Sequence, residues 1–545
     1  MKMPVAAFTL FLLAGACAAP CVIAQQGQSP VTAAVAVSPE DLLAQPVGAN
    51  WTSYNGDYTG RRYSSLREVN ISNASQLRLA WVFHPGNSQN LEATPVVIRG
   101  IMYVTAANDV FSLDARTGRL LWHYQRRVSA GLLDDAAAHK NRGVAVWQDS
   151  VYTETDDAHL VCLDARSGNL RWDIEYADKA KHYGATSAPL VVKGSVIVGT
   201  SGGDSGVRGF VAAYDAGTGK LKWRFWTIPG PGEFGSSSWP GDSYLHGGGT
   251  TWMPGTYDPA LNTIYWTTSN AAPDFVGDSR PGDDLYTASV LALNPDTGNL
   301  KWYFQFTPHD LYDYDANETP VLVDVEQNGT ARHLLVQANR NGFFYVLDRT
   351  SGKFLRATAF IEKLNWARGI DASGRPLLSG RIPTLEGNYI CPGIDGATNW
   401  FSPSYNPGTG LFYVMALESC NMFFASPKEF VRGQTYYDTG TKLPADEHSR
   451  KILLALSLDG KPAWRYPQAG QAHSWGGTLT TAGGLVFFGD DAGSFEALDA
   501  ASGHPLWHFN TGQQFRASPM TYAIDGVQYV AISAGSDVLS FVLPH

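Results

Sequence analysis

A short phrase recurs along this chain and limits what the chain can fold into. In its full form, Leu or Tyr is followed by Asp or Asn, two variable residues, Ser or Thr, and Gly, with Trp four residues after the Gly. Full copies are centred on Asp114, Asp164, Asp215, Asn294 and Asp499. Degenerate copies stand at Asp348 and Asp459, and the segment around Trp81 matches the tryptophan part of a further copy, which makes eight.

The phrase has the chemistry of a strand, a tight turn and a second strand. Asp or Asn caps the turn, Gly supplies the positive φ, and Trp begins the next strand. A β-rich run precedes the phrase, as in 100–104 and 194–198. Four-stranded units repeated at this spacing are typical of propeller blades. The sequence therefore predicts an all-β fold, an eight-bladed β-propeller with tryptophan-docking blade motifs.

The phrase tryptophans are expected to be structural. Each should pack between neighbouring sheets and donate its indole N–H to a neighbour. We assign this role to Trp81, Trp122, Trp172, Trp223, Trp302, Trp464 and Trp507.

Two long insertions interrupt the repeat. The first copies recur after 50 and 51 residues, but 79 residues separate Asp215 from Asn294, and a second long stretch follows Asp348. Long loops on a rigid scaffold often carry function. We therefore expect residues 230–250 and 360–390 to line the mouth of a central funnel.

The N-terminus has the pattern of an export signal. A short basic start precedes an apolar run over 5–19, and Ala24 ends a small-residue cleavage site. We predict that 1–24 is a cleaved signal peptide and that 25–545 is a single propeller domain in the periplasm. No later segment is apolar for long enough to span a membrane. The net charge of −10 and the lack of a basic patch speak against a nucleic-acid partner.

The five cysteines bear on the compartment and the cofactors. The alternative to a cleaved signal is a lipoprotein attached at Cys17 or Cys21, but each has Ala three residues before it, where such signals usually have Leu. In an oxidising compartment Cys391 and Cys420 are able to pair, which would leave Cys162 as a buried thiol. The chain has no CxxCH motif, so a covalently attached c-type haem is not expected.

Longer motifs carry a resemblance to a known family. They run in order from 51–64 through 201–209, 268–273 and 307–313 to 519–522. Together with the eight phrases, they resemble the PQQ-dependent alcohol dehydrogenases, the group that contains methanol and ethanol dehydrogenases. The resemblance covers nearly the whole mature chain. It implies a pyrroloquinoline quinone (PQQ) cofactor in a funnel on the propeller axis, together with a metal ion.

The resemblance implies the cofactor contacts residue by residue. Arg142 matches the arginine that binds the carboxylate region of the quinone, a role suited to a forked and permanently charged donor. Arg340 matches an arginine near the reactive oxygens, and Trp252 matches the indole that stacks on the ring. The other implied contacts are Glu92, Thr186, Ser201, Gly202, Gly203 and Trp475. The alternative for Trp252 and Trp475 is a structural role.

The resemblance also implies a metal site made of oxygen ligands. Asp204 stands where the methanol and ethanol enzymes have Glu, Asn270 matches the second ligand, and Asp313 matches the catalytic aspartate. Oxygen ligands suit Ca²⁺ better than Zn²⁺. Asp315 occupies a position that is acidic in lanthanide-using members and Ala in the calcium methanol enzymes; otherwise it would cap a turn in 312–317. The metal is therefore Ca²⁺ or a trivalent lanthanide.

One family feature is missing and another is present. Ala136 and Ala137 occupy the positions of two adjacent cysteines that form a disulfide ring against the cofactor in the methanol and ethanol enzymes. We therefore expect weaker retention of the cofactor and a more open funnel. Cys391 and Cys420 match a second disulfide of the family.

The implied reaction is the oxidation of an alcohol to an aldehyde or ketone. Asp313 takes the hydroxyl proton as general base, a hydride passes to the quinone, and Arg340 stabilises the developing charge. The metal acts as a Lewis acid. The electrons are expected to pass to an external soluble cytochrome c. The open funnel favours a sugar, a polyol or a bulky secondary alcohol over methanol. The alternative is a cofactor-free propeller that acts as a periplasmic protein-docking scaffold, against which the joint presence of the site residues speaks.

Overall fold

The chain is built almost entirely of β-strands. The computed structural model describes residues 36–86, 90–133, 136, 139–327, 329–437, 440–470 and 473–544, which belong to one compact unit. The predicted signal peptide, Cys17, Cys21 and Ala137 lie outside the described residues. One α-helix, α1 (Pro39–Leu43), is described along its whole length, and none of the described helices is long and apolar enough to cross a membrane.

Short 3₁₀-helices interrupt the loops. They are η1 (Ala74–Gln76), η2 (Lys179–Lys181), η3 (Gly203–Ser205), η4 (Ser236–Ser238) and η5 (Ser243–His246). Because strands make up nearly all the remaining regular structure, the prediction of an all-β fold is confirmed.

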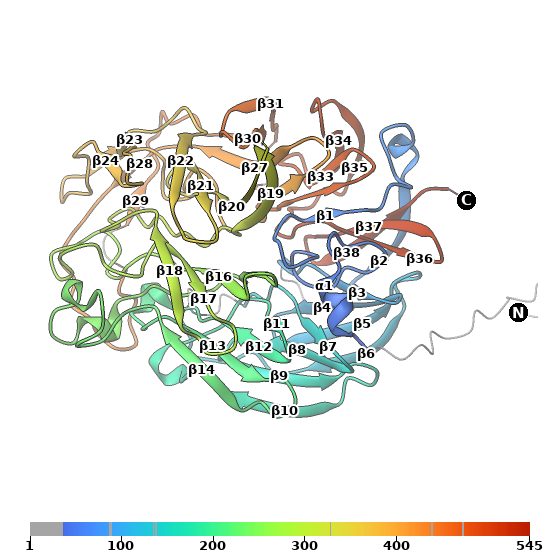
Figure 1. Ribbon diagram of the computed structural model, residues 1–545, viewed down its shortest axis with the longest axis horizontal. Coiled ribbons are helices and arrows are strands. Elements are labelled where there is room, and N and C mark those ends of the chain that lie inside the picture. Colours follow the sequence, from blue (N-terminus) through green and yellow to red (C-terminus); the bar gives the residue numbers. More distant parts are fainter. Residues whose placement is uncertain are drawn as a thin grey trace, which may run out of the picture. The chain divides into compact units, whose positions relative to one another are not determined.

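In the described part of the chain, eight sheets have four or more strands, and they follow one another in chain order around a ring (Figure 1). This is the arrangement of a β-propeller. The strands of the first four sheets along the chain are β3 (Val96–Ile98), β4 (Ile101–Ala106), β5 (Asp109–Asp114) and β6 (Leu120–Gln125); β7 (Ala145–Trp147), β8 (Ser150–Glu154), β9 (His159–Asp164) and β10 (Leu170–Glu175); β11 (Leu190–Val192), β12 (Ser195–Val198), β13 (Phe210–Asp215) and β14 (Leu221–Trp226); β15 (Thr256–Asp258), β16 (Thr263–Thr267), β17 (Ser289–Leu293) and β18 (Leu300–Gln305).

The C-terminal half supplies most strands of the other four sheets. These strands are β19 (Val321–Gln327), β20 (Thr330–Ala338), β21 (Phe343–Asp348) and β22 (Phe354–Ala359); β26 (Ser404–Asn406), β27 (Leu411–Glu418), β30 (Arg450–Leu456) and β31 (Pro462–Pro467); β1 (Tyr63–Ser64), β32 (Thr478–Thr481), β33 (Leu485–Gly489), β34 (Ser494–Asp499) and β35 (Pro505–Asn510); β2 (Arg78–Phe83), β36 (Met520–Ile524), β37 (Val527–Ala534) and β38 (Asp537–Val542).

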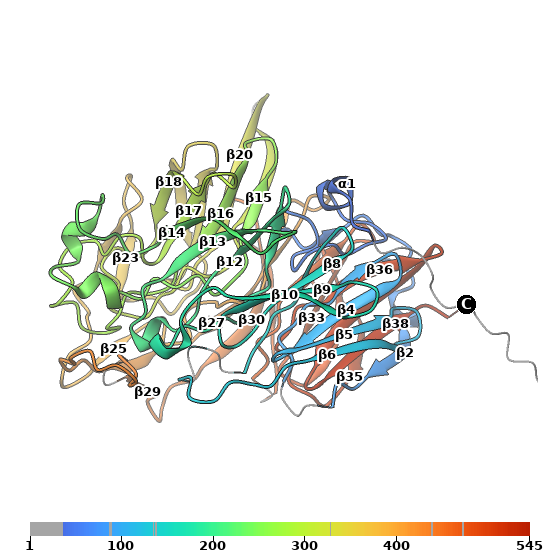
Figure 2. The same ribbon diagram turned by 90° about the horizontal axis from the view of Figure 1, so that it is seen from below.

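The ring closes by pairing the two ends of the chain. Strand β2 pairs antiparallel with β38, so one sheet contains strands from both ends (Figures 1 and 2). Within a sheet, burial falls from the inside outward: β4 is buried along its whole length, whereas β6 alternates between exposed and half-buried residues. The core therefore lies between the sheets, and the loops that leave the inner strands are free to build a site.

The phrase glycines lie against the tryptophan of the preceding copy, except Gly460, which lies against Thr358. The indole N–H of Trp81 donates to the carbonyl of Ala115 at 3.0 Å, and a Cβ on Gly118 would lie 2.7 Å from the Trp81 ring. The same hydrogen bond recurs at Trp122, Trp223, Trp464 and Trp507. The predicted bond is wrong for Trp172, whose buried indole nitrogen has no hydrogen-bond partner among the described residues.

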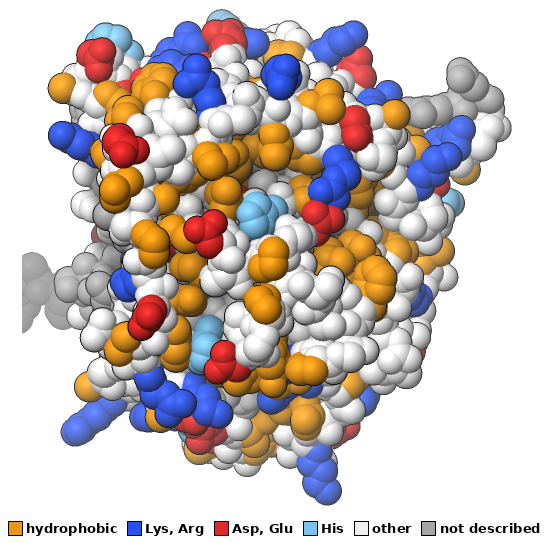
Figure 3. Space-filling view, turned by 90° about the vertical axis from the view of Figure 1, so that its left-hand side faces the viewer, with side chains coloured by type: hydrophobic (Ala, Val, Ile, Leu, Met, Phe, Trp, Pro, Cys, Tyr) orange, Lys and Arg blue, Asp and Glu red, His pale blue; other side chains and the backbone are white. Residues whose placement is uncertain are grey.

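The insertions form additional loops and small sheets on one side of the ring. The small sheets are β23 (Ala367–Ile370) with β24 (Pro376–Leu378), and β25 (Asn388–Ile390) with β28 (Asn421–Phe423) and β29 (Thr441–Lys442). Figure 3 shows apolar side chains scattered among charged ones on the face formed by this side. The most exposed large apolar side chains of the described chain, Phe234 (71%) and Leu385 (70%), belong to the insertions.

Candidate cofactor and metal site

A cavity of about 400 Å³ collects the residues that the motifs single out. All thirteen predicted cofactor and metal residues line it: Glu92, Arg142, Thr186, Ser201, Gly202, Gly203, Asp204, Trp252, Asn270, Asp313, Asp315, Arg340 and Trp475. They come from loops between 92 and 475 that leave different sheets, so the propeller ring brings distant motifs to one place.

Arg142 occupies a fixed position at one end of this cavity. Its Nη1 donates to the carbonyl and the hydroxyl of Thr186 at 3.0 and 2.8 Å, and its Nη2 lies 2.7 Å from Glu92 Oε2. The guanidinium also stacks on two indoles, with its Cζ 5.0 Å from the ring centre of Trp252 and 4.4 Å from that of Trp400. Its buried Nε has no hydrogen-bond partner among the described residues.

The Asn-Arg-Gly turn explains how the sequence places this arginine. Asn141 accepts from the Gly143 N–H at 2.9 Å and donates to the Glu154 carbonyl at 2.8 Å. Gly143 has a φ of +144°, and a Cβ there would lie 3.1 Å from the Thr94 carbonyl oxygen. A glycine is therefore needed directly after the arginine.

A glycine-rich segment forms one wall of the cavity. Gly202 has a φ of +101°, and a Cβ there would lie 2.5 Å from the carbonyl oxygen of His182. Ser201 Oγ donates to the carbonyl of Ala136, whose side chain is buried. The segment then enters η3, which carries Asp204. The glycines leave bare backbone on this wall, which allows a flat ligand to approach closely.

The loop over 310–315 places two carboxylates at the other end of the cavity. The Asp310 carboxylate accepts from the backbone N–H groups of Tyr312 and Tyr314, at 3.0 and 2.8 Å. The two tyrosines stack on each other and pack in the core. The alternate residues, Asp313 and Asp315, line the cavity.

Arg340 links these two carboxylates. Its Nη2 donates to Asp313 Oδ2 and its Nη1 to Asp315 Oδ2, both at 3.0 Å. Asn270 donates from its backbone to Asp315 Oδ1 at 2.7 Å and from its side chain to Asp204 Oδ1 at 3.4 Å. Asn270, Asp204, Asp313 and Asp315 therefore lie at the same end of the cavity.

Burial and mutual repulsion raise the pKa values of these acids. The pKa of Asp313 lies well above its usual value because of burial and the nearby carboxylates of Asp315 and Asp204, although Arg340 opposes the shift. Burial also raises the pKa of Asp315, against the opposing charge of Arg340. An added cation would stabilise the charged forms of both acids.

The carboxylates do not converge on one point. Within the described part of the chain, no three His, Cys, Asp or Glu side chains form a group close enough to hold a metal ion by themselves. Arg340 instead takes one oxygen from each of Asp313 and Asp315. The acids and the Asn270 amide nevertheless supply the oxygen donors that a hard cation prefers.

Sequence reasoning missed seven residues that also line the cavity: Lys140, Thr250, Ile394, Asp395, Asn399, Trp400 and Arg516. Lys140 directly precedes the Asn-Arg-Gly motif, and Thr250 precedes Trp252 by two residues, so adjacency was an available signal for both. Arg516 and the 394–400 segment had no such signal, because their position depends on how the loops meet.

The two insertions contribute little to this cavity. Only Thr250 of residues 230–250 lines it, and no residue of 360–390 does. Leu245 and His246 line a separate cavity of about 700 Å³, together with His182, Arg208 and Phe430.

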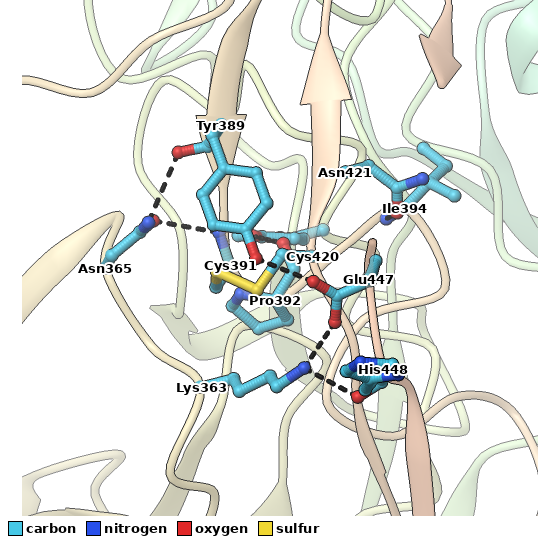
Figure 4. Close-up of a disulfide and its surroundings, with 11 residues drawn as sticks. Lys363, Asn365, Tyr389, Cys391, Pro392, Ile394, Cys420, Asn421, Glu447 and His448 are labelled. Carbon is cyan, nitrogen blue, oxygen red and sulfur yellow. Dashed lines mark hydrogen bonds and ion pairs between the residues drawn. A yellow bond between two sulfur atoms is a disulfide. The ribbon is translucent and has the colours of Figure 1, made fainter. Parts of the chain in front are cut away.

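The disulfide lies next to the site. Cys391 and Cys420 are bonded, as the family resemblance implied (Figure 4). Cys162 is a buried free thiol. Close to the bond, the N–H of Ile394 donates to Asn421 Oδ1 at 3.0 Å. The carbonyl of Ile394 accepts from Arg340 at 2.6 Å, so the cross-linked region directly supports the arginine.

Comparison with known proteins agrees with the motifs. The family described as PQQ glucose/ethanol/alcohol dehydrogenase, beta-propeller domain, matches residues 51–359 and 457–530. Quinohemoprotein alcohol dehydrogenase ADH IIB of Pseudomonas putida is 41% identical over 90% of this chain and 74% of its own length. Quinoprotein alcohol dehydrogenase PedH of Pseudomonas putida is 37% identical over 92% of this chain and 88% of its own.

A solved structure agrees as well. A europium-containing methanol dehydrogenase is 30% identical, with a TM-score of 0.84 over 92% of this chain and 99% of its own. The fold, the ordered motifs and these relatives lead to one conclusion: the chain belongs to the family of PQQ-dependent quinoprotein alcohol dehydrogenases.

Proposed function

We propose that this chain oxidises an alcohol to an aldehyde or ketone with PQQ and a metal ion bound in the 400 Å³ cavity. The observation that carries the proposal is that all thirteen implied residues line that one cavity. A chance set of solvated loop residues spread along the chain would be scattered over the surface instead.

The chemistry of the cavity fits PQQ. Arg142 and Arg340 each keep a buried Nε without a hydrogen-bond partner among the described residues, so each has a donor available for a ligand. The wall at Gly202 is bare backbone, and Trp252 supplies an aromatic face. When bound, PQQ supplies a quinone that accepts two electrons and a proton from the alcohol.

We assign proton transfer to Asp313 and its positioning to Arg340. The Asp313 carboxylate accepts the hydroxyl proton of the alcohol as general base. Arg340 holds that carboxylate through the 3.0 Å hydrogen bond and places positive charge beside it. Because the site is buried, this charge is screened less than it would be at the surface and stabilises negative charge that develops on oxygen.

We assign the metal to Asp204, Asn270, Asp313 and Asp315. Their donors are oxygens, which suits Ca²⁺ or a trivalent lanthanide. The europium in the related methanol dehydrogenase supports a metal of the second kind. Both Asp315 oxygens accept hydrogen bonds, one from Asn270 and one from Arg340, which supports the alternative role of Asp315 as a loop-holding residue. The activity of Asp315→Ala, measured with Ca²⁺ and with La³⁺, distinguishes the ligand role of Asp315 from the loop-holding role.

The same proposal covers the rest of the molecule. The eight large sheets are the eight blades, the phrase tryptophans dock one blade on the next, and 25–545 is one domain. Residues 1–24 direct the chain to the periplasm, an oxidising compartment in which the Cys391–Cys420 disulfide is stable. Electrons leave to an external soluble cytochrome c.

A binding and product experiment tests the proposal. The purified apo-protein would be titrated with PQQ plus Ca²⁺ or La³⁺, with tryptophan fluorescence as the readout. It would then be given ethanol, polyols and bulky secondary alcohols, and aldehyde or ketone would be measured. We expect saturable quenching and a carbonyl product. Absence of both would favour the alternative, a cofactor-free docking scaffold.

A further inference from the structure

Lys140 and Arg516 are cationic side chains that line the cavity with Arg142 and have no role in the proposed reaction. The Nζ of Lys140 lies 3.7 Å from Glu92 Oε1, and its side chain is 20% exposed. Arg516 is half-buried and lines the same cavity. Glu92 also binds Arg142 at 2.7 Å, so one carboxylate serves two of the three cations.

The guanidinium of Arg516 contacts a neutral side chain. Its Nε donates to Gln514 Oε1 at 2.9 Å, and no carboxylate of the described residues lies within ion-pairing distance of its guanidinium. Lys140 lies close enough to Arg516 for their charges to interact. Burial lowers the pKa of Lys140, and the charge of Glu92 opposes this shift. The charges of Arg516 and Arg142 lower the pKa of Lys140 further. The three cations therefore form one positive cluster.

The cavity is electrically polarised as a result. Among the described residues at this end, Lys140, Arg142 and Arg516 face one carboxylate, that of Glu92. At the other end the described lining residues carry one cation, Arg340, and four carboxylates: Asp204, Asp313, Asp315 and Asp395. An excess of buried positive charge is costly unless an anion offsets it. At the acidic end a bound cation would offset the excess negative charge in the same way.

We propose that Lys140 and Arg516 join Arg142 to form the carboxylate-binding end of the cavity and select a polyanionic cofactor by its charge. The inference rests on the proposed function, since PQQ carries three carboxylates. Within the described part of the chain, Arg142 by itself has one unpartnered donor, its Nε, because its Nη groups already contact Thr186 and Glu92. Lys140 and Arg516 would supply donors for a carboxylate at this end of the ring and would orient the ring so that its quinone edge faces Asp313 and the metal ligands.

The test compares PQQ with its trimethyl ester, which keeps the ring and lacks the three charges. Affinities would be measured by calorimetry for wild type, Lys140→Met, Arg516→Gln and the double variant. Lys193→Met is the matched control, because Lys193 is an exposed lysine paired with Asp296 at 3.3 Å and does not line the cavity. Thermal unfolding would verify that each variant is folded.

We expect each single variant to bind PQQ about tenfold more weakly, a typical loss for one charge-assisted hydrogen bond, and the double variant to lose more. Affinity for the ester should stay unchanged, and added salt should weaken PQQ binding less in the double variant than in wild type. The charge-conserving Lys140→Arg and Arg516→Lys variants should recover most of the affinity.

Equal PQQ affinity in wild type and double variant would overturn the inference. An equal loss of affinity for PQQ and for the ester would also overturn it. That result would mean that the two side chains shape the cavity and do not recognise the charge of the cofactor. If wild type binds neither compound, the proposed function itself fails, and that outcome is distinct from the other two.

Discussion

Nη2 of Arg340 lies 3.0 Å from Oδ2 of Asp313, inside the cavity that collects the predicted cofactor and metal residues. The proposed base therefore has its positive partner in place before any ligand binds. Burial nevertheless keeps the pKa of Asp313 well above its usual value. A bound metal ion would lower that pKa and prepare the carboxylate to accept a proton.

Replacing Asp313 with Asn should remove the base and keep the shape. We expect the rate of alcohol oxidation to fall by about 10²- to 10⁴-fold, the usual contribution of general acid–base catalysis. Titration with PQQ and steady-state kinetics would be compared with wild type. Full activity in a variant that still binds PQQ would show that another group takes the proton.

Asp315→Ala distinguishes the two metals. If Asp315 is a ligand for a trivalent ion, activity supported by La³⁺ should be lost, while activity supported by Ca²⁺ should persist. The variant would be assayed with each metal over a range of concentrations. Equal losses with both metals would instead indicate that Asp315 serves to hold Arg340 and Asn270.

The buried acid Glu154, whose backbone carbonyl accepts from Asn141 beside Arg142, should make the stability of the fold depend on pH. Glu154 is fully buried, and burial raises the pKa of its carboxyl to about 8, although a hydrogen bond from Tyr176 opposes the shift. A folded-state pKa above the ordinary value of 4.5 means that the stabilising contribution is full below pH 4.5 and is lost as the pH rises through about 8.

Glu154→Gln should remove this dependence, because Gln keeps an oxygen that accepts from Tyr176 and cannot ionise. Melting temperatures of the two proteins would be compared from pH 5 to pH 8. We expect the melting temperature of the variant to rise relative to that of wild type as the pH increases. Parallel curves would contradict the assignment.

Gly298→Ala should reveal how tightly the blades pack. A Cβ at Gly298 would lie 2.6 Å from the Trp223 ring, and the residue has a φ of +75°. Gly526→Ala is the control, because Gly526 has a φ of +86° and no heavy atom within 4 Å of the added Cβ. Both variants pay the backbone strain of about 1–2 kcal/mol.

Only Gly298→Ala adds the cost of overpacking, typically about 1–3 kcal/mol. Its melting temperature should therefore fall further than that of Gly526→Ala. Equal decreases would show that the blade interface accommodates an extra methyl group.

The double variant Cys391→Ser, Cys420→Ser tests the disulfide. The bond joins residues 29 apart, and its loss should destabilise the fold by about 3 kcal/mol. Because Ile394 near the bond accepts from Arg340, PQQ affinity should fall as well. Unfolding and PQQ titration would be measured together. Unchanged PQQ affinity together with reduced stability would show that the disulfide stabilises the fold without supporting the binding site.

Much of the fold follows from the recurring phrase, because one local rule fixes a strand, a turn and a packed tryptophan. The phrase glycines fit their predicted role: Gly118 has a φ of +72° and lies against Trp81. The pairing of β2 with β38 could not be derived from any local pattern, since it depends on how far each sheet turns around the ring. The missing hydrogen bond of Trp172 also depends on the neighbouring sheet.

Arg142 and Asp313 were implied by the family resemblance of their motifs, and both line the cavity, while their roles stay predictions. The site was not predictable at Trp400 or Arg516, which reach the cavity only because separate loops converge there. The expectation for residues 230–250 shows the same limit. Length indicated a functional loop, but only three-dimensional packing decides which cavity a loop lines.

If the proposed function is right, this chain oxidises alcohols only when PQQ and a metal are both bound. The most direct measurement is dye-linked alcohol oxidation by the apo-protein with PQQ alone, metal alone, and PQQ with Ca²⁺ or La³⁺, with Asp313→Asn as control. We expect activity only when PQQ and a metal are combined, and strongly reduced activity in the variant. Activity without PQQ, or no oxidation of any alcohol under every condition, would contradict it.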